Sequence, residues 1–390
     1  MTTAIRNQRH PMQYRRFGRT EKMLSVITLG GMRYTHGWES PRDQVPAETI
    51  AECVTMTQMA LDAGINHIET AHGYGKSEYC YGQVLNQELR VPRDRYNLMT
   101  KGGPMSPEDV RRSIDEQLKG LQTDHIDLYG WHGINNRETL NAVLKSGAIE
   151  ELLKLKAEGV IGDVGFSTHG PLDVVMDALA TGLFSFVNLH YYYFYQRLAG
   201  AVAYAASKDI GVFIISPNDK GGQLFNPPPL LSNLCAPLTP IQFNARWCLR
   251  TPAVQTLTFG MTRPEHVREA LGVMPVSVPF TANELAIQIG LDNRLANDPV
   301  SAWEGWECLG DPSDINIPEV LRFRRLWKCF DMRGFAEYRY NMLETKGHWF
   351  PGSFATDEAI SKVDTTRVPA GIDLKAMLRE THAALYKAKA

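Results

Sequence analysis

Apolar and polar positions alternate along the chain in blocks, in which a short apolar run is followed by a longer stretch with helical spacing. Several of the short runs, such as residues 212–215, are continuous rather than alternating, which is typical of parallel strands buried on both faces. In the longer stretches an apolar residue recurs every three or four positions, as at Val110, Ile114, Leu118 and Leu121. We therefore expect strands and helices to follow one another in a repeating order.

About eight strand–helix units of this kind make up roughly 250 residues, the usual size of a closed (β/α)8 barrel. The expected strands cover residues 23–29, 65–69, 95–100, 126–131, 160–166, 184–189, 212–215 and 254–258. The expected helices cover residues 47–63, 78–89, 108–121, 149–157, 172–180, 199–208, 239–249 and 264–271. The alternative is a doubly wound open sheet. It is disfavoured because no Gly-x-Gly-x-x-Gly follows the first strand.

The fold class that we expect is therefore α/β, a (β/α)8 TIM barrel with a mostly helical C-terminal extension. The barrel is expected over residues 12–274, and the extension over residues 280–390 is expected to pack on it. Three prolines at 227–229 predict a long loop after the seventh strand. In the extension, Ile317 and Pro318 begin an expected helix.

Composition and charge exclude several classes of function. Hydrophobic residues at 44% and charged residues at 22% are ordinary for a globular protein, and a net charge of -2 favours neither nucleic acid nor an anionic membrane as a partner. No apolar run reaches the ~18 residues of a membrane span, and the first residues lack the apolar segment of a secretory signal. The 6 cysteines include no Cys-x-x-Cys, which suits reduced thiols in a cytoplasmic protein.

Ionisable residues end three consecutive expected strands. Glu69 ends the second, Lys101 follows the third and His132 follows the fourth, while Tyr74 lies in the loop after the second. Catalytic groups of such barrels lie at the carboxyl ends of the strands and on the loops that follow them. Each residue alone is more often a solvated charge, a core histidine or a packed tyrosine. Their shared register favours a site.

Such a set supports proton transfer to a carbonyl oxygen. A free tyrosine has a pKa of about 10, and a neighbouring ammonium group, that of Lys101, is expected to lower it by up to ~3 pH units. Glu69 is expected to hold Lys101, and His132 to orient the carbonyl. A metal-dependent barrel hydrolase is disfavoured, and no metal site is expected, because no His-x-His pair stands at a strand end and His67 falls within a strand.

The motifs around these residues resemble those of the aldo-keto reductase superfamily. Residues 69–75, Glu-Thr-Ala-His-Gly-Tyr-Gly, are similar to the family's Asp-Thr-Ala-x-x-Tyr-Gly, with Glu69 in place of the aspartate. Residues 127–132, Asp-Leu-Tyr-Gly-Trp-His, match its Asp-Leu-Tyr-x-x-His, and Lys101 matches its strand-ending lysine. The resemblance covers roughly residues 12–274. It implies a barrel that binds NADP(H) or NAD(H) across its mouth and reduces carbonyl compounds, with Tyr74 as the general acid and base.

The resemblance also implies a set of cofactor-binding residues. Ser167 and Thr168 would face the nicotinamide amide, and Tyr191 would stack on the nicotinamide ring. Residues 216–222 would cover the pyrophosphate, and residues 260–269 would hold the adenosine 2′-phosphate, which favours NADPH. The implied set is Gly31, Met32, Ser167, Thr168, Asn188, Tyr191, Ser216, Pro217, Lys220, Gly222, Gly260, Thr262, Arg263, His266 and Glu269.

The C-terminal extension resembles that of a subgroup of these reductases with a ferredoxin-like domain, on residues 315–322, Ile-Asn-Ile-Pro-Glu-Val-Leu-Arg. A four-iron cluster needs about four closely spaced thiolates. The stretch just before this segment, residues 305–312, contains only Cys308, and Cys329 stands 21 positions later, so no cluster is expected. Two functions follow: an NADPH-dependent reductase of small carbonyl compounds, or a cofactor-binding regulatory or partner-binding barrel with little turnover. Glu69 and the missing cysteines favour the second, and the retained Tyr74, Lys101 and His132 favour the first.

Overall fold

The computed structural model describes residues 4–34, 41–219, 222–310, 313–342 and 352–388. These form two compact units, one of Met1–Pro217 with Asn244–Pro279 and the other of Asn218–Phe243 with Phe280–Ala390. The expected domain division did not place residues 218–243 with the C-terminal extension. Within the second unit the short helix α8 (Pro229–Cys235) packs against α11 (Ala282–Ala296), so this segment belongs to a helical core and not to a loop of the barrel.

The first unit is a closed barrel of parallel strands in the order β10-β3-β4-β5-β6-β7-β8-β9, which confirms the predicted fold class. The strands are β3 Ile27–Gly30, β4 His67–Glu69, β5 Asn97–Gly102, β6 Ile126–His132, β7 Ile161–Ser167, β8 Phe186–Leu189, β9 Gly211–Ile214 and β10 Thr256–Gly260. The register pairs Gly30 with Glu69, and His132 with Ser167. The carboxyl ends of neighbouring strands therefore meet at one mouth of the barrel.

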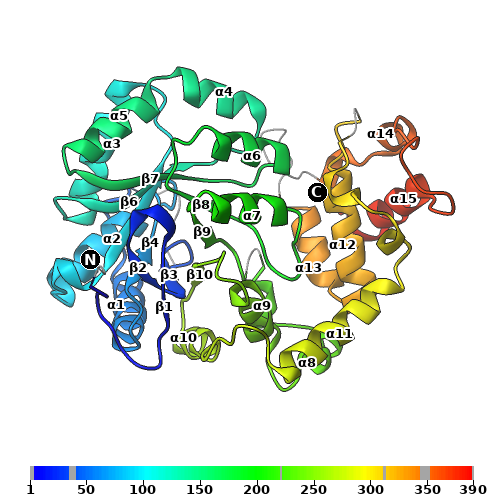
Figure 1. Cartoon of the computed structure of the whole chain (residues 1–390), viewed down its shortest axis with the longest axis horizontal. Coiled ribbons are helices and arrows are strands. Elements are labelled where there is room, and N and C mark those ends of the chain that lie inside the picture. Colours follow the sequence, from blue (N-terminus) through cyan, green and yellow to red (C-terminus); the bar gives the residue numbers. More distant parts are fainter. Residues whose placement is uncertain (1–3, 35–40, 220–221, 311–312, 343–351, 389–390) are drawn as a thin grey trace. The chain divides into compact units, whose positions relative to one another are not determined.

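The helices of the barrel unit lie outside its strands (Figure 1). They are α1 Ala47–Asp62, α2 Ser77–Gln83, α3 Pro107–Leu121, α4 Arg137–Lys145, α5 Ala148–Ala157, α6 Leu172–Ala180, α7 Ala199–Ser207 and α10 Pro264–Leu271, while α9 Pro240–Leu249 crosses the boundary between the units. Local chemistry sets the start of α3, where Ser106 Oγ accepts a hydrogen bond from Asp109 N and Pro107 occupies the first turn. Two features were not expected. The helix α4 lies in a stretch without a prediction, and α2 ends early in a π-helical turn, Val84–Glu88.

The apolar run 23–29 is two strands and not one. β2 (Met23–Ser25) pairs antiparallel with β1 (Tyr14–Arg16), and β3 then enters the barrel. Phe17 and Leu24 from this hairpin join Met99, Phe186 and other apolar side chains in a fully buried cluster. The hairpin therefore contributes part of the barrel's core. Because residues of both β2 and β3 are buried, their hydrophobic positions form one run in the sequence although the two strands belong to different sheets.

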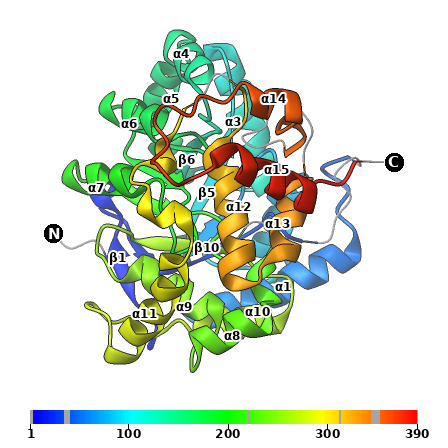
Figure 2. The same ribbon diagram turned by 90° about the vertical axis from the view of Figure 1, so that its right-hand side faces the viewer.

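The second unit is helical in its described part. Its helices are α8 Pro229–Cys235, α11 Ala282–Ala296, α12 Ile317–Phe330, α13 Arg333–Tyr340, α14 Asp357–Ser361 and α15 Leu374–Leu385. Asn316 caps α12 by accepting a hydrogen bond from Glu319 N, so the helix begins where Ile317 and Pro318 predicted it. The helices α12, α13 and α15 pack against one another (Figure 2). None of the helices in the described ranges combines the length and the apolar character that a membrane span requires.

Candidate active site

A buried ion pair lies where β4 and β5 end at the barrel mouth. The Nζ of Lys101 donates hydrogen bonds to Oε1 of Glu69 and, at 2.7 Å, to the main-chain oxygen of Thr70. The side chains of Lys101 and Glu69 are only 1% and 3% exposed. Thr258 on β10 donates to Oε2 of Glu69 at 3.1 Å. The carboxylate is therefore bonded on both oxygens, as a buried charge requires.

Tyr74 contacts this pair from the loop of residues 70–76. Its hydroxyl donates to Oε1 of Glu69 at 3.4 Å, and the Nζ of Lys101 lies 4.8 Å from the centroid of its ring. The ring of His132, at the end of β6, lies edge-on to Tyr74 with the centroids 5.6 Å apart. The structure thus brings together Glu69, Tyr74, Lys101 and His132, the four residues that the sequence singled out.

The electrostatics of Tyr74 differ from the expectation. Burial raises its pKa well above the ordinary value of 10, and the charge of Glu69 raises it further, while Arg33 acts in the opposite direction. The prediction that Lys101 lowers the pKa of Tyr74 is wrong for this arrangement. Glu69 is one methylene longer than aspartate, and its Oε1 lies between the phenol and the ammonium. The hydroxyl therefore meets the carboxylate, and the ammonium lies over the ring.

Lys101 is also perturbed by its surroundings. Burial lowers its pKa, and the charges of Glu69 and Glu78 oppose that effect. Glu78 makes no direct contact with the ammonium among the hydrogen bonds of Lys101, so it acts through space. Two carboxylates therefore favour the charged form of a lysine that has almost no access to solvent.

The residues expected to face the nicotinamide lie at the ends of β7 and β8. Ser167 Oγ accepts from Gly133 N at 3.1 Å, and Thr168 Oγ1 donates to Ile134 O at 2.6 Å, so both hydroxyls are bonded to the loop after β6. Asn188 is fully buried, and its Oδ1 has no hydrogen-bond partner among the described residues. A buried acceptor without a partner is rare in proteins, and it suits a carboxamide N–H.

Tyr191 follows β8 and is 8% exposed. Its hydroxyl accepts from Nη2 of Arg250 at 3.3 Å, and its ring lies 5.1 Å from that of Trp247. In the loop after β9, Ser216 has φ +54°, and Pro217 O accepts from Asn244 Nδ2 at 2.6 Å. Gly222 has φ +71°, and Lys220 lies outside the described residues.

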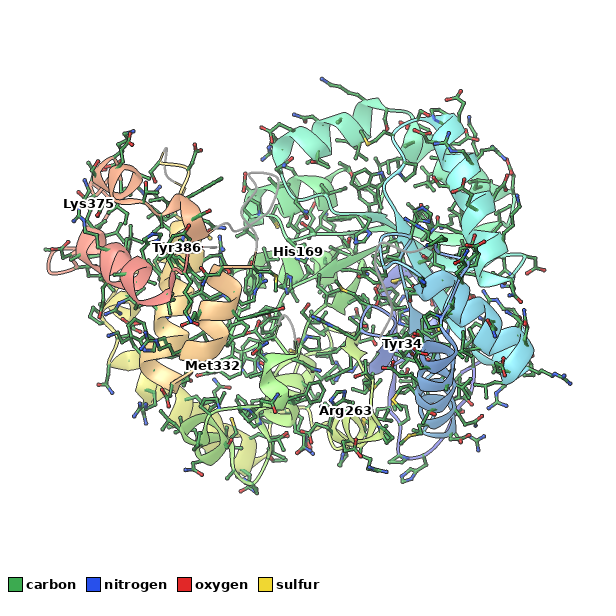
Figure 3. The ribbon with its side chains drawn as sticks, turned by 180° about the vertical axis from the view of Figure 1, so that it is seen from behind. Tyr34, His169, Arg263, Met332, Lys375 and Tyr386 are labelled. Atoms are coloured by element: carbon green, nitrogen blue, oxygen red, sulfur yellow. The ribbon has the colours of Figure 1, made fainter. Side chains whose placement is uncertain are left out.

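The segment expected at the adenosine 2′-phosphate runs from the end of β10 into α10. A side chain at Gly260 would place its Cβ 2.4 Å from Cγ of Arg33, so the close approach of Arg33 requires glycine there. Arg263 is exposed at the start of α10, a helix whose first-turn N–H groups favour anions (Figure 3). Burial lowers the pKa of His266, and Arg263 lowers it further. Its Nδ1 accepts from Thr262 N at 3.3 Å, and its Nε2 lies 3.2 Å from Nη2 of Arg263. Glu269 lies on the same helix.

The remaining two expected residues lie just after β3. Gly31 donates from its N–H to Glu69 O at 2.9 Å, and a Cβ there would lie 2.3 Å from Ser77 Oγ. Met32 is 38% exposed. Both therefore belong to the barrel mouth beside the ion pair.

Sequence reasoning missed other residues at this mouth. Thr258, which bonds Glu69, stands two positions before Gly260, so the period of a strand could have placed it on the same face. Arg33 could not be found this way, because it lies on a loop. His169 and His190, which follow β7 and β8, are paired at 2.7 Å between Nδ1 and Nε2 (His169 in Figure 3). Nothing in the sequence around either histidine predicts that the two side chains pair.

The profile of the aldo/keto reductase family matches residues 26–224, just over half of the 390 residues. Among curated proteins, the L-galactose dehydrogenase of Arabidopsis thaliana is 35% identical over 43% of this chain, and the 6-dehydroglucose reductase of Novosphingobium aromaticivorans is 31% identical over 31% of it. The matches span only 55% and 42% of those two proteins.

Solved structures share the fold. An aldo-keto reductase from Bacillus halodurans in its holo form aligns with a TM-score of 0.60 and 21% identity, over 72% of this chain and 96% of that one. An aldo/keto reductase from Klebsiella pneumoniae in complex with NADP and acetate aligns with a TM-score of 0.55 and 22% identity, over 70% and 93%. At this level of identity the similarity concerns the fold alone.

Proposed function

Because the chain belongs to the aldo/keto reductase family of NAD(P)-dependent oxidoreductases, we propose that it reduces aldehydes or ketones to alcohols with NADPH and uses Tyr74 as the general acid. The observation that carries the proposal is the cluster at the barrel mouth. There the Tyr74 hydroxyl reaches the Glu69 carboxylate, and the Lys101 ammonium lies over the phenol ring. His132 lies against the same ring.

Each residue of the cluster has a separate role in the proposed reaction. NADPH, when bound, supplies the hydride. The hydroxyl of Tyr74 turns from Glu69 to the carbonyl oxygen and gives up its proton, and the raised pKa keeps that proton in place until then. Lys101 stabilises the phenolate that remains, and Glu69 holds Lys101. His132 orients the carbonyl. General acid catalysis of this kind contributes ~10²–10⁴-fold to the rate.

The residues around the mouth suit a nicotinamide dinucleotide. Asn188 Oδ1 is a buried acceptor in need of a donor, and a carboxamide would provide one. Arg263 offers a cation at the N-terminus of α10, where the helix dipole favours a phosphate, and this favours NADPH over NADH. The remaining candidates for cofactor binding are those named from the sequence, on the segments after β3, β7, β8, β9 and β10.

The substrate is proposed to be a small carbonyl compound. Two relatives are named for sugar chemistry, as L-galactose dehydrogenase and 6-dehydroglucose reductase. We therefore include sugar lactols and oxidised sugars with simple aldehydes in the panel that tests the proposal. The readouts are NADPH oxidation in the reductive direction and NADP+ reduction in the oxidative one.

The decisive test replaces Tyr74 with phenylalanine. We expect kcat/KM to fall ~10²–10⁴-fold, because the general acid is lost. NADPH binding, followed by fluorescence quenching, should stay within about twofold, because Phe keeps the ring. Tyr129→Phe is the matched control, since Tyr129 is a buried tyrosine of β6 whose hydroxyl has no hydrogen-bond partner in the described structure. Equal rates for wild type and Tyr74→Phe would contradict the proposal.

A second function is favoured by one observation. The carboxylate of Glu69 beside the Tyr74 hydroxyl disfavours the phenolate that must form in each turnover. A barrel that binds the cofactor and turns over little is therefore the alternative, with a regulatory or partner-binding role. Tight NADPH binding without Tyr74-dependent turnover on any substrate of the panel would favour it.

For the C-terminal unit, we infer descent from the subgroup with a ferredoxin-like extension, with the cluster cysteines lost. Cys308 is exposed and Cys329 is buried, and no set of three or more potential metal ligands occurs within the described ranges. The extension is proposed to serve as a packing module for the barrel. All six cysteines are free thiols, which suits the cytoplasm, the compartment that we propose.

A further inference from the structure

Another buried carboxylate of the barrel unit lies where α2, α3 and β5 meet, and the proposed chemistry does not use it. Glu78, on α2, is 3% exposed. Its Oε1 accepts hydrogen bonds from Thr100 Oγ1 at 2.6 Å and from Gln117 Nε2 at 2.7 Å. Its Oε2 lies 3.2 Å from Nδ1 of His72. A buried carboxylate is costly unless it is bonded in this way, so these three contacts offset the free-energy cost of burying the Glu78 charge.

His72 connects this network to the loop that carries Tyr74. Its main-chain N donates to Lys101 O at 2.8 Å, and its main-chain O accepts from Arg42 Nη1 at 2.7 Å. The imidazole is one-third exposed and reaches down to Glu78. The loop is therefore fixed at three points only two residues before Tyr74.

The same network fixes the strand that carries Lys101. The main-chain O of Lys101 accepts from His72 N and also lies 3.3 Å from Gln117 Nε2, which is bonded to Glu78. Next to His72, a Cβ at Gly73 would lie 3.5 Å from Cε1 of His132. The loop therefore runs directly against the His132 ring. One buried carboxylate thus ties the Tyr74 loop to the Lys101 strand.

We propose that His72 and Glu78 form a positioning pair, which holds the loop of residues 70–76 so that the Tyr74 hydroxyl meets Glu69 and its ring meets Lys101. The proposal rests on the proposed function for its kinetic consequences. Its physical basis is that catalytic geometry must be held to a fraction of an ångström by groups that do not react. Neither residue touches the reacting atoms in this arrangement.

The charge of Glu78 adds an electrostatic effect to the mechanical one. Glu78, on α2, faces His72 of the loop. It also acts through space on Lys101 of β5 and on Tyr129 of β6, and Lys101 itself contacts Glu69. Together with Glu69, Glu78 favours the ammonium form of Lys101 against the effect of burial. The pair therefore holds the Tyr74 loop in position, and its carboxylate favours the charged form of Lys101.

The test compares two amides at position 72. In His72→Asn the amide N–H occupies the place of the Nδ1–H and can still donate to Glu78. In His72→Gln it lies one bond too far along the side chain. We expect His72→Asn to keep kcat within about threefold, and His72→Gln to lower kcat ~10–100-fold with NADPH affinity unchanged, as a misplaced catalytic group does. Glu78→Gln should lower kcat in the same way.

His125 provides the matched control. It is paired with Asp124 at 2.6 Å through its own Nδ1, but this pair is exposed on the turn before β6. His125→Asn and His125→Gln should both match wild type. A folded His72→Gln protein with wild-type kcat, equal losses for Asn and Gln, or a loss that lies in NADPH affinity would each overturn the positioning role.

A second readout does not depend on turnover. The N–H groups of His72 and Tyr74 are bonded to Lys101 O and Ala71 O, and their hydrogen exchange reports how firmly the loop is held. We expect exchange to accelerate at least tenfold in His72→Gln and to stay near wild type in His72→Asn. Unchanged exchange in His72→Gln overturns the proposal. If the wild type reduces nothing, the proposed function fails, and the exchange result still decides the role of the pair.

Discussion

The barrel and the C-terminal unit each contain a buried carboxylate that holds cations, and the two are built differently. In the barrel, Glu69 is bonded to Lys101 and Tyr74. In the C-terminal unit, Asp298 contacts Arg324 and Arg325, each at 3.2 Å, with its side chain 2% exposed. Both arrangements place positive charge beside a buried carboxylate. Only the partners of Glu69 can release a proton, because arginine stays charged at any pH a protein tolerates.

The comparison shows that a buried ion pair does not by itself mark a site. Asp298 also accepts from Val300 N at 3.3 Å and begins a short 3₁₀ turn, so its bonds hold α12 to the end of the preceding segment. Glu69 lies at the mouth of a barrel, and its neighbours come from β4, β5, β10 and the loop after β4. What distinguishes the site is the presence of groups with transferable protons at the carboxyl ends of the barrel strands.

The largest expected difference between the two units appears when a substitution removes one partner of each buried ion pair. Lys101→Met should lower kcat/KM ~10²–10³-fold, since an electrostatic stabiliser of the phenolate is lost. Asp298→Asn should cost about 3 kcal/mol of unfolding free energy, because it removes the buried negative charge that two largely buried arginines share, but keep the rate per folded molecule. Kinetics and urea titration measure the two effects. The exposed pair Arg112–Asp109 is the control, and Arg112→Ala should cost less than about 1 kcal/mol. A rate loss in Asp298→Asn would remove the distinction between the clusters.

A smaller effect separates the buried histidines of the two units. Burial lowers the pKa of His67, inside the barrel, from 6.5 to about 3. The unfolded chain therefore binds more protons than the folded one between about pH 3 and 6.5, so stability is complete above pH 6.5 and is lost as pH falls. The slope is up to ~1.4 kcal/mol per pH unit.

Unfolding free energies between pH 5 and 8 test this, and His67→Gln should flatten the curve. His382, in the C-terminal unit, is about half buried and its pKa is lowered less, so His382→Gln should change the slope by a smaller amount. Parallel curves for wild type and His67→Gln would show that His67 is not held neutral.

The smallest expected effect concerns the length of the acid. Glu69→Asp withdraws the carboxylate from the Tyr74 hydroxyl and should lower the pKa of Tyr74. Alcohol oxidation, which needs the phenolate, should then gain its activity about one pH unit lower, a change worth ~1.4 kcal/mol. Reduction at pH 7 needs the phenol and should change little. Glu158→Asp, on the surface, is the control. An unmoved pH profile would mean that Glu69 does not set the pKa of Tyr74.

The sequence by itself determined the barrel and the identity of the central residues. Continuous apolar runs, helical spacing and the order of strand ends are local properties, and they were enough to place Glu69, Lys101 and His132 on neighbouring strands of a closed barrel. The motif around Tyr74 placed the phenol beside them. In each case a short stretch of chain contained the whole signal.

Only the tertiary structure decided which atoms meet. Burial raises the pKa of Tyr74, and Glu69, bonded through Oε1 to both the Tyr74 hydroxyl and the Lys101 ammonium, raises it further; this arrangement depends on three separate segments. The pairing of His72 with Glu78, the packing of residues 218–243 with the C-terminal helices and the split of residues 23–29 between two sheets are of the same kind. Each arises from contacts between distant parts of the chain, whose packing and burial no local period encodes.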